Sequence, residues 1–474
     1  MKLDSKQIDS AVGVLVGQAA GDALGVPYEF GTRPLEGEPQ MLGGGLGGIA
    51  PGQWSDDTEM AVCIAEVAAT GTDLRTEGAL DRIATGFLRW YADGPPDIGI
   101  QTRQVLATTA RRGAPPSATM RQVATELHDK TGRSGGNGSL MRTGPVALAH
   151  LGDPAAIAEA ARAVSALTHH DPVAGDACAL WCLAINHAVG TGELDVRAGL
   201  SLVDAGYWAP LLAEAETVEP GHYAHNNGWV VPALLAAWSA ISRTSGVVPG
   251  LHAAVAGGGD TDTVAAIVGQ LLGAAYGASA VPATYRRRLH GWPGLRVRDL
   301  HRLAFLTVNG GQDGPDGWPS GADIAAYGNS RRGVVPHPDD DGVLLGAVGA
   351  VRPGAAAAVV SLCRMGAGSP QLTGVPPEDH VEFWVVDKEN ANNDLSGQLL
   401  DAARTVRELR GEGKRVLLHC VHAQTRTPVV AAVYGALVTG SSTRAALDRV
   451  LAVLPSAAPR PCFRRTLEAM EVGT

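Results

Sequence analysis

The sequence contains few cysteines and few aromatic residues for its length. Its 474 residues include six cysteines, and aromatic residues make up 5% of the chain. The cysteines show neither the close paired spacing of a zinc site nor the density of a disulfide-stabilised secreted domain, which favours a reducing compartment. The N-terminal residues carry charges of both signs, and Gln18 and Asp22 interrupt the apolar stretch that follows. We therefore expect a cytoplasmic protein without a signal peptide or a membrane span.

An excess of basic residues is also lacking. The chain has 38 lysines and arginines against 48 aspartates and glutamates, which gives a formal net charge of -10. Such a chain has no general electrostatic attraction to nucleic acid or to anionic lipid, so we expect neither as a partner. Any phosphate-bearing ligand must be bound locally. Hydrophobic residues at 45% and charged residues at 18% predict a globular protein rather than a disordered one.

The length and the change of pattern along the chain predict two domains. Residues 1–310 consist of Ala- and Leu-rich helical segments joined by Gly/Pro loops, and we predict an all-α domain there. Residues 311–338 are rich in turn formers and are predicted to be a linker. Residues 339–474 are predicted to form a small α/β domain with a mainly parallel sheet. Its expected strands lie at 355–362, 381–387 and 415–420, with helices at 399–413 and from about Thr427.

Glycines recur every four residues in two segments of the first predicted domain. This spacing places them on one face of a helix and lets a neighbouring helix approach closely. We interpret both sets as packing features. The two sets are Gly13, Gly17, Gly21 and Gly25, and Gly269, Gly273 and Gly277.

Two short acidic clusters interrupt the helical pattern, at 55–58 (SDDT) and 257–263 (GGGDTDT). Asp and Thr just before a helix are good N-caps, and that role alone explains one residue in each cluster. It does not explain why four carboxylates occur together in the two clusters. Adjacent ionised carboxylates repel unless a cation is bound, and carboxylate and hydroxyl oxygens without Cys suit Mg²⁺ or Mn²⁺. On these residues alone, a structural metal site without catalysis stays open.

Three further segments stand beside the acidic clusters. Residues 21–30 read GDALGVPYEF, and the glycine-rich loop 135–142 (GGNGSLMR) opens a helix, where backbone N–H groups can hold a phosphate. Residues 167–172 (LTHHDP) end another helix, where a histidine is more often a cap than a ligand. Aromatic residues at 223, 229 and 238 are expected in a helical core, with stacking on adenine as the alternative.

Taken in order, these motifs resemble the ADP-ribosylhydrolase family, which includes the dinitrogenase reductase-activating glycohydrolase. The resemblance runs through GDALGVPYEF, WSDDTEM, GGNGSLMR, LTHHDP and GGDTDT and covers most of residues 10 to 310. It implies an all-α fold with two Mg²⁺ ions in a cleft. By position, the metals would be held by Ser55, Asp56, Asp57, Asp260, Asp262 and Thr263. The substrate would be contacted by Glu29 at the ribose, by Asn137, Gly138, Ser139 and Met141 along the ADP-ribose path, and by His169 near the distal ribose or adenosine.

The chemistry implied by this resemblance is hydrolysis of the N- or O-glycosidic bond between ADP-ribose and an acceptor. A metal pair positions the ribose, a water attacks its anomeric carbon, and Asp57 or Asp262 accepts the proton of that water, with Glu29 at the ribose. The expected partner is an ADP-ribosylated protein or an ADP-ribose-containing small molecule. The acceptor stays open between arginine, serine, an acetyl ester and nucleic acid. Two alternatives are a non-catalytic ADP-ribose-binding module and a phosphatase that uses the helical domain as a scaffold.

The second predicted domain contains the motif His-Cys, five residues, Arg-Thr. Cys420 ends an apolar strand, and Arg426 and Thr427 follow as a helix begins. A backbone loop around a phosphate, closed by an Arg, would depress the Cys pKa. The segment resembles the dual-specificity and protein-tyrosine-phosphatase-like superfamily, which implies Cys420 as nucleophile and Asp387, or alternatively Asp394, as general acid. In the same comparison, Arg426 would bind the phosphoryl oxygens and Thr427 would ease release of the phosphoenzyme.

One position of this loop departs from the superfamily. It usually has Gly in the middle of the loop, where this chain has Ala423, and a Cβ there can crowd an unusual backbone conformation. A phosphate- or ADP-ribose-phosphate-binding module therefore remains the alternative to an active phosphatase. With both domains active, the protein would be bifunctional.

Overall fold

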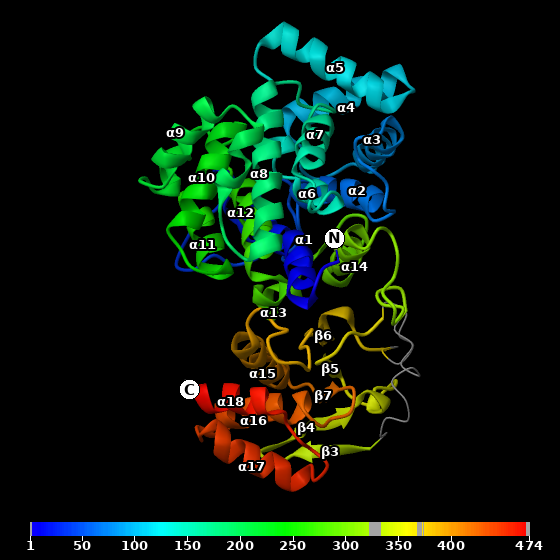
Figure 1. The fold of residues 1–474 in the computed structure, drawn as a ribbon, viewed down its shortest axis with the longest axis vertical. Helices are drawn as coiled ribbons and strands as arrows, with labels where there is room; N and C mark the ends of the chain where they lie inside the picture. Colours follow the sequence, from blue (N-terminus) through cyan, green and yellow to red (C-terminus); the bar gives the residue numbers. More distant parts are fainter. Residues whose placement is uncertain (1, 322–332, 367–371, 373, 471–474) are drawn as a thin grey trace. The chain divides into compact units, whose positions relative to one another are not determined.

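The structure is a computed structural model that describes residues 2–321, 333–366, 372 and 374–470 (Figure 1). The chain divides into two compact units. We call the first the helical unit; it comprises Met1–Leu3, Gln7–Val281 and Arg288–Gln312. We call the second the C-terminal unit; it comprises Asp4–Lys6, Pro282–Arg287 and Asp313–Thr474.

This division differs in two ways from the predicted boundaries 1–310, 311–338 and 339–474. The segment Pro282–Arg287, expected in the first domain, belongs to the C-terminal unit. Strand β3 (Val334–His337) lies inside the predicted linker, and residues 322–332 of that linker lie outside the described residues. The turn-forming composition around β3 and its Pro336 concealed an edge strand, the kind of strand in which proline is tolerated.

The helical unit is mostly helical, as predicted. Its two-stranded antiparallel ribbon, β1 (His290–Gly291) with β2 (Leu295–Arg296), was not predicted, because two-residue strands leave no alternating pattern. The α-helices are α1 (Ser5–Gly25), α2 (Asp56–Ala68), α3 (Glu77–Ala92), α4 (Ile100–Arg112), α5 (Pro116–Thr131), α6 (Gly144–Ala149), α7 (Pro154–Ser165), α8 (Pro172–Thr191), α9 (Ala205–Ala215), α10 (Val230–Ser242), α11 (Val247–Gly257), α12 (Thr261–Tyr276) and α14 (Val297–Val308). Short 3-10 turns include η1 (Val26–Gly31), η2 (Asn137–Ser139), η3 (Val196–Leu202), η4 (Pro220–Tyr223) and η5 (Ala278–Ala280).

Helix α8 is the one described helix that is long and apolar enough to cross a membrane by length and composition. Within the structure, 72% of its apolar window is buried by the rest of the protein. Burial of this kind is typical of the core helix of a globular domain, and it explains the apolar composition of α8 without a lipid phase.

The two glycine sets bring α1 and α12 into direct backbone contact, which confirms their interpretation as packing features (Figure 1). A Cβ added at Gly17 would lie 2.2 Å from the carbonyl oxygen of Gly269. At the end of α1, a Cβ on Gly25 would lie 2.4 Å from the Cα of Asp262, so the same contact positions an acidic loop. Gly277 differs from its set, because it ends α12 with a φ of 89°.

We expect Gly17→Ala to destabilise the helical unit by about 2–3 kcal/mol, because the added methyl group must push two helix backbones apart. Urea unfolding followed by circular dichroism measures the change. Gly190→Ala in α8 is the matched control, since nothing lies within 4 Å of its Cβ position, and it should stabilise the unit by roughly 0.5 kcal/mol. Equal effects of the two substitutions would contradict the close packing.

The C-terminal unit is built on a five-stranded mixed sheet in the order β3-β4-β7-β5-β6. The pairs β4·β7, β7·β5 and β5·β6 are parallel, and β3 runs antiparallel to β4. The strands are β3, β4 (Asp340–Ala347), β5 (Ala358–Ser361), β6 (His380–Glu382) and β7 (Val416–Cys420). The helices are α13 (Ala283–Arg286), α15 (Leu395–Gly411), α16 (Arg426–Thr439), α17 (Thr443–Val453) and α18 (Pro461–Ala469), with 3-10 turns η7 (Val348–Ala350) and η9 (Pro377–Asp379).

The predicted strand at 381–387 is wrong in its extent. Strand β6 ends at Glu382, and of the apolar residues that follow, Phe383 and Val385 are buried. The backbone N–H of Phe383 still donates to the carbonyl oxygen of Ser361 at 2.8 Å. Strand β4 was not predicted from the sequence, because the acidic residues at its start obscure the apolar pattern of its second half. Alternate residues of the central strands enter two different cores. One core includes Val343, Leu345, Val360 and Leu418 with α15 and α16, and the other includes Leu344, Val359 and Leu417.

The segment Pro282–Arg287 is an integral part of the C-terminal unit. Ala283 belongs to the larger of its apolar cores, and the backbone N–H of Ala283 donates to a carboxylate oxygen of Asp401 at 3.0 Å. The Arg286 side chain donates to the carbonyl oxygen of Glu382 at 2.9 Å. A segment that precedes β3 by about fifty residues therefore contributes to the packing of the sheet unit.

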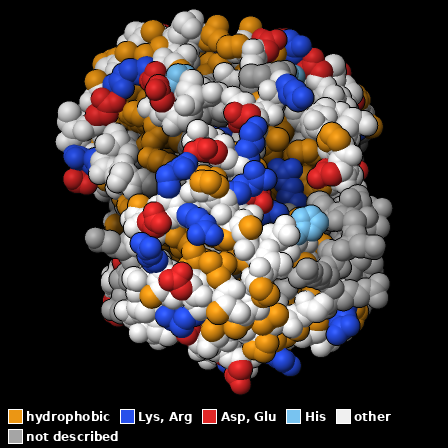
Figure 2. Space-filling view, turned by 60° about the horizontal axis from the view of Figure 1, so that its bottom comes forward, with side chains coloured by type: hydrophobic (Ala, Val, Ile, Leu, Met, Phe, Trp, Pro, Cys, Tyr) orange, Lys and Arg blue, Asp and Glu red, His pale blue; other side chains and the backbone are white. Residues whose placement is uncertain are grey.

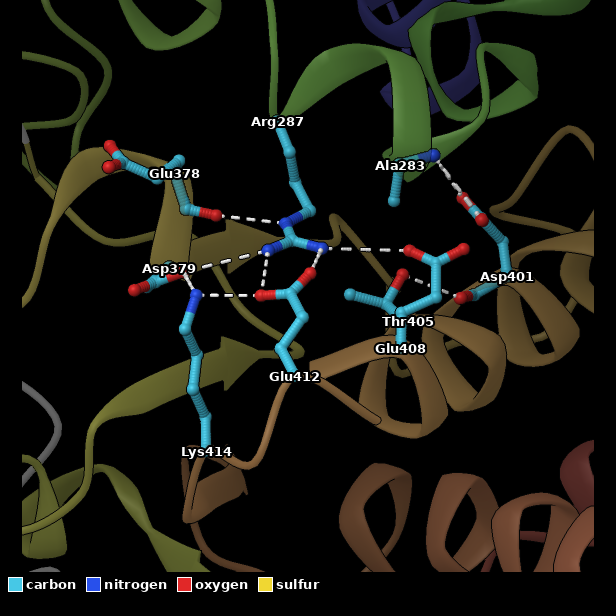
Figure 3. A network of polar contacts seen from close by, with 9 residues as sticks. All are labelled: Ala283, Arg287, Glu378, Asp379, Asp401, Thr405, Glu408, Glu412 and Lys414. Atoms are coloured by element: carbon cyan, nitrogen blue, oxygen red, sulfur yellow. Dashed lines mark hydrogen bonds and ion pairs between the residues drawn. The ribbon is translucent and has the colours of Figure 1, made fainter. Parts of the chain in front are cut away.

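A polar network anchors the end of this segment (Figure 3). Arg287 donates to the carbonyl oxygen of Glu378 at 2.9 Å and forms ion pairs with Glu412 at 3.1 Å and Asp379 at 3.5 Å. Lys414 contacts the same two carboxylates at 2.6 Å each. Because the Arg287 and Asp379 side chains are 11% and 7% exposed, water screens these pairs only weakly.

Arg287→Ala is expected to destabilise the C-terminal unit by about 3 kcal/mol, since it leaves Asp379 and Glu412 with a single cation between them. Arg465→Ala serves as the control in the same unit, because Arg465 pairs with Glu389 at a site where both side chains are about 60% exposed. Its cost should stay below about 1 kcal/mol. Thermal unfolding of the full chain measures the stability of both variants. Similar losses of stability in the two variants would show that burial of the network is unimportant.

Side chains of both charge signs occur together on the face drawn in Figure 2, with apolar side chains between them. This mixture is typical of an ordinary solvated protein surface.

Candidate functional site

Asp22 of α1 holds the beginning of α2. Its Oδ1 accepts hydrogen bonds from the backbone N–H and the hydroxyl of Ser55, both at 2.8 Å. Its Oδ2 accepts from the backbone N–H of Thr58 at 3.0 Å and from the hydroxyl of Thr58 at 2.6 Å. Burial raises the pKa of Asp22 to about 6 despite these four donors. The motif GDALG did not indicate a role for Asp22. In the structure, Asp22 is the residue that orients Asp56 and Asp57.

The carboxylates of Asp56 and Asp57 lie at the first turn of α2. The Ser55 hydroxyl is 2.9 Å from Asp57 Oδ2, whereas Asp57 Oδ1 is buried and has no hydrogen-bond partner among the described residues. Burial, and then the charges of Asp22 and Asp56, raise the pKa of Asp57 well above its ordinary value. The pKa of the half-buried Asp56 is also raised, by burial and then by Asp97, which sequence reasoning missed because an isolated Asp carries no signal.

A second group of carboxylates is formed by Glu29, Asp260 and Asp262. One oxygen atom from each lies within 4.8 Å of the others, and all three residues are buried. Burial, and then the charges of Asp260 and Asp97, raise the pKa of Glu29 to about 9. For Asp262, burial and then the charge of Glu29 raise the pKa well above its ordinary value. Glu29, expected at the ribose, thus lies beside predicted metal ligands from a segment more than 200 residues away.

Helix capping does not account for these acidic clusters. Ser55 and Asp260 stand at the N-cap positions of α2 and α12, and neither makes a side-chain capping hydrogen bond. The backbone N–H of Asp260 instead donates to the Asn227 side chain at 2.9 Å. Burial raises the pKa of Asp260, although hydrogen bonds from Asp262, Asn137 and Thr263 oppose this shift. The side-chain oxygens of both clusters therefore serve the site rather than their helix ends.

The loop around Gly259 is held in a conformation that suits glycine. Gly259 has a φ of 74°, and a Cβ there would lie 2.3 Å from the carbonyl oxygen of Ala224. Its own carbonyl oxygen accepts a hydrogen bond from the backbone N–H of Phe30 at 2.7 Å, and Phe30 itself has a φ of 45°. This bond ties the segment that carries Glu29 to the start of α12.

The glycine-rich loop contributes one residue directly to the acidic clusters. The side-chain N–H of Asn137 donates to Asp260 Oδ2 at 2.8 Å. Gly138 packs against the His169 ring, where a Cβ would lie 3.2 Å from Cε1. The other two predicted substrate contacts turn towards the core: the Ser139 hydroxyl accepts from the Cys178 thiol at 3.5 Å, and the Met141 side chain is buried.

The three aromatic residues of the 223–238 segment divide into two groups. Tyr223 and Trp238 are buried, which confirms the expectation of a helical core. Trp229 contradicts that expectation, because it precedes α10 and is 44% exposed. It lies against the glycine-rich loop, where a Cβ on Gly135 would be 2.6 Å from Trp229 Nε1. Its position before the helix rather than inside it explains the exposure.

The acidic clusters fit a hard divalent cation. Carboxylates this close repel one another when ionised, and a bound cation removes that repulsion. Asp57 Oδ1 is available as a ligand, because no described residue hydrogen bonds to it. The donor atoms are carboxylate and hydroxyl oxygens, which suit Mg²⁺ or Mn²⁺ better than zinc.

The cysteine motif of the C-terminal unit spans the end of β7 and the start of α16. Cys420 is the last residue of β7 and is buried, and Arg426 is the first residue of α16. Arg426 Nη1 donates to the carbonyl oxygens of Leu362 at 2.9 Å and Val385 at 3.0 Å. The hydroxyl of Thr427 is buried and has no partner among the described residues.

The two candidate general acids are in different situations. Asp394 caps α15, where its Oδ1 accepts from the backbone N–H of Gly397 at 2.8 Å. Asp387 is half-buried and lies 2.9 Å from the Nε of Arg460. Both carboxylates are therefore engaged, Asp394 as a helix cap and Asp387 in an ion pair with Arg460.

A buried polar chain that sequence reasoning missed lies behind the cysteine. The Ser361 hydroxyl is 2.7 Å from His419 Nε2 and 2.9 Å from His380 Nε2, so β7, β5 and β6 each supply one member. Burial lowers the pKa of His419 to about 4, which keeps this ring neutral. The signal in the sequence was the His that directly precedes Cys420.

Ala423 occupies a strained position, as predicted from the usual glycine there. Its φ is 56°, a left-handed value that costs a non-glycine residue about 1–2 kcal/mol. We expect Ala423→Gly to stabilise the C-terminal unit by about 1 kcal/mol in urea unfolding. Ala432→Gly inside α16 is the control of opposite sign, because it should cost about 1 kcal/mol. A loss of stability in Ala423→Gly would show that the loop carries no strain.

Comparisons with known proteins match the helical unit over nearly its whole length. A family model described as ADP-ribosylglycohydrolase matches residues 3–313. The chain is 27% identical over 302 residues to the ADP-ribosylarginine hydrolase Tri1 of Serratia proteamaculans (strain 568), a match that covers 60% of this chain and 76% of that protein. It is 30% identical over 291 residues to the ADP-ribosyl-dinitrogen reductase glycohydrolase of Rhodospirillum rubrum, which covers 59% of this chain and 90% of that protein.

Among solved structures, a crystal structure of human DUSP28 matches with 20% identity and a TM-score of 0.25, covering 28% of this chain and 90% of that one. The family match, by contrast, includes the whole acidic cluster of the helical unit.

Proposed function

The chain belongs to the ADP-ribosylglycohydrolase family, and from this premise we propose that its helical unit is a Mg²⁺-dependent hydrolase of the bond between ADP-ribose and an acceptor. The observation that carries the proposal is the convergence of Glu29, Asp260 and Asp262 within 4.8 Å. So many buried carboxylates at one place call for a bound cation, given the cost of burying each charge.

Six residues are proposed to hold two Mg²⁺ ions, with Mn²⁺ as a possible substitute. When bound, the metal supplies charge that polarises and orients the hydroxyls of the substrate ribose. Asp22 supports this set from α1, because its hydrogen bonds fix the first turn of α2. The proposed ligands are Ser55, Asp56, Asp57, Asp260, Asp262 and Thr263.

The side chains of this chain account for the remaining steps. Asp57 or Asp262 accepts a proton from water as the water oxygen bonds to the anomeric carbon of the ribose. The bond from that carbon to the acceptor breaks, and the acceptor leaves with the proton that the carboxyl group took from the water. Glu29 is proposed to hydrogen bond to a ribose hydroxyl, and Asn137 holds Asp260 in place through its 2.8 Å contact.

We propose ADP-ribosylarginine in a protein as the first acceptor to test, because one relative is named an ADP-ribosylarginine hydrolase. The full chain is incubated with an arginine-ADP-ribosylated protein in Mg²⁺ and in EDTA, and free ADP-ribose is quantified. Release that requires the metal supports the proposal. Tight binding of ADP-ribose without release from arginine, serine or ester linkages would identify a non-catalytic binding module instead.

For the C-terminal unit we propose a cysteine-dependent phosphatase. Cys420 Sγ attacks phosphorus while Asp387 gives its proton to the departing oxygen, and Arg426 neutralises the phosphoryl oxygens. Water then breaks the sulfur–phosphorus bond, assisted by the Thr427 hydroxyl. The support is the placement of Cys420 and Arg426 at the two ends of one short loop before α16. A phosphate-binding module remains the alternative.

A further inference from the structure

Arg142 is a fully buried guanidinium group in the helical unit, with 0% of the residue exposed. No ion pair to it occurs in the part of the chain that the structure describes. Its Nη2 donates to the Thr168 hydroxyl at 2.6 Å, and its guanidinium lies 4.5 Å from the centre of the Phe87 ring. Burial lowers the pKa of Arg142 to about 10, so the group stays charged at neutral pH. Burying a charge without a counter-ion is costly, and this cost calls for an explanation.

Thr168 connects Arg142 to His169. Its hydroxyl oxygen lies 2.7 Å from His169 Nδ1. Arginine has donors and no acceptor, so the Thr168 oxygen must accept the bond from Arg142. The single hydroxyl proton of Thr168 is then directed at His169 Nδ1, which acts as the acceptor. A neutral imidazole that accepts at Nδ1 carries its proton at Nε2.

The opposite arrangement is unfavourable in this environment. If Nδ1 carried the proton, the Thr168 oxygen would accept two bonds and its own proton would point into a fully buried region. No second acceptor for this hydroxyl is found among the described residues. A buried donor without a partner costs about 1–3 kcal/mol, which favours the Nε2-protonated tautomer of His169 by a similar amount.

His169 Nε2 faces the glycine-rich loop. It lies 3.3 Å from the Cβ position of Gly136 and 3.4 Å from that of Gly138, and no described residue accepts a hydrogen bond from it. Between these glycines, Asn137 reaches the acidic cluster at Asp260. Side chains at either glycine would cover the ring. His169 is buried, with 2% of the residue exposed, and the glycines at 136 and 138 place no side chain of this loop against its Nε2.

We propose that Arg142 and Thr168 are positioning residues that hold His169 as the Nε2–H tautomer, a neutral donor for an oxygen atom of the ADP-ribosyl group. This inference rests on the proposed function, and it adds the reason for the buried Arg142. Burial and the charge of Arg142 also keep the pKa of His169 well below its ordinary value. The ring therefore presents a donor of constant protonation state at neutral pH.

The experiment combines a spectroscopic and a binding measurement on the full chain. ¹⁵N-histidine NMR reports the protonation of each ring nitrogen, and the His169→Gln variant assigns the signals. Wild type should show a proton on Nε2 and none on Nδ1 of His169. In Thr168→Val that preference should be lost, and the Kd for ADP-ribose should rise about tenfold, the loss of about 1.4 kcal/mol. Thr168→Ser keeps the hydroxyl and should restore both properties.

Thr168→Val leaves Nη2 of Arg142 without its acceptor, although Nη1 keeps its 3.4 Å hydrogen bond to the Met60 sulfur. Arg142→Met therefore provides a second test with a side chain of similar length and no charge. It too should abolish the tautomer preference while the fold is kept. A proton on Nδ1 in wild type, or an unchanged Kd in Thr168→Val, would overturn this inference alone. Failure of wild type to bind ADP-ribose at all would overturn the proposed function together with the recognition role of His169.

Discussion

Replacing Asp57 with asparagine is expected to lower Mg²⁺-dependent release of ADP-ribose about 1,000-fold, which corresponds to about 4 kcal/mol of transition-state stabilisation. Asp57 Oδ1 is the buried oxygen without a partner, and Asp57 is also one of the two proposed proton acceptors. Asparagine has almost the same shape and can keep the contact with the Ser55 hydroxyl, so the loss isolates the charge. Initial rates at saturating Mg²⁺ measure it.

In the absence of metal, Asp57→Asn should make the protein more stable than wild type, the opposite of its effect on activity. Without metal, removal of one carboxylate relieves repulsion from Asp22, Asp56 and Asp260, so the melting temperature in EDTA should rise. Addition of Mg²⁺ should raise it less than in wild type, because one ligand is lost. Asp153→Asn is the control, since Asp153 caps α7 and asparagine caps equally well. Release at the wild-type rate by Asp57→Asn would eliminate Asp57 as ligand and as base.

Cys420→Ser is expected to lower hydrolysis of p-nitrophenyl phosphate by at least about 1,000-fold, because a serine hydroxyl in this loop is a far weaker nucleophile than a thiolate. ADP-ribose release by the helical unit should stay unchanged. Cys462→Ser is the matched control, since Cys462 is a half-buried thiol on α18 and should leave both activities intact.

Two outcomes would contradict the phosphatase proposal in different ways. Equal rates for Cys420→Ser and wild type would place the activity elsewhere. Phosphate binding by wild type without any turnover would establish the binding module, with the left-handed Ala423 as one place to look for the cause.

Part of the candidate site was readable from the sequence because the residues are neighbours in the chain. Repulsion between adjacent carboxylates indicates a cation site at two places in the sequence, at Asp56 and Asp57 and at Asp260 and Asp262. The cysteine motif is likewise local, because a strand, a loop and a helix follow one another without interruption. Such motifs need no knowledge of distant contacts.

Other members of the site depend on contacts between distant segments. Asp22 looks like an ordinary residue of a glycine-rich helix, and its four donors come from residues 33 and 36 positions later. Glu29 meets Asp262 because Phe30 bonds to Gly259 and Gly25 packs against the backbone of Asp262 across the fold. The burial of Ser139 and the exposure of Trp229 also depend on which way each segment faces, and composition does not specify that direction.

The sequence by itself determined the chemistry available to this protein: oxygen donors in pairs, a glycine-rich loop, and a cysteine and an arginine at the spacing of a phosphate loop. It also determined that each of the two glycine-bearing helices can be approached closely by a neighbour, because glycines every four residues leave one face without side chains. Only the tertiary structure decided which carboxylates converge, that Pro282–Arg287 packs in the C-terminal unit, and that Arg142 reaches His169 through Thr168. The physical reason is that the periodic pattern of residue types describes only the neighbours of a residue along the chain. The convergence of side chains from distant segments depends on how whole helices and strands pack.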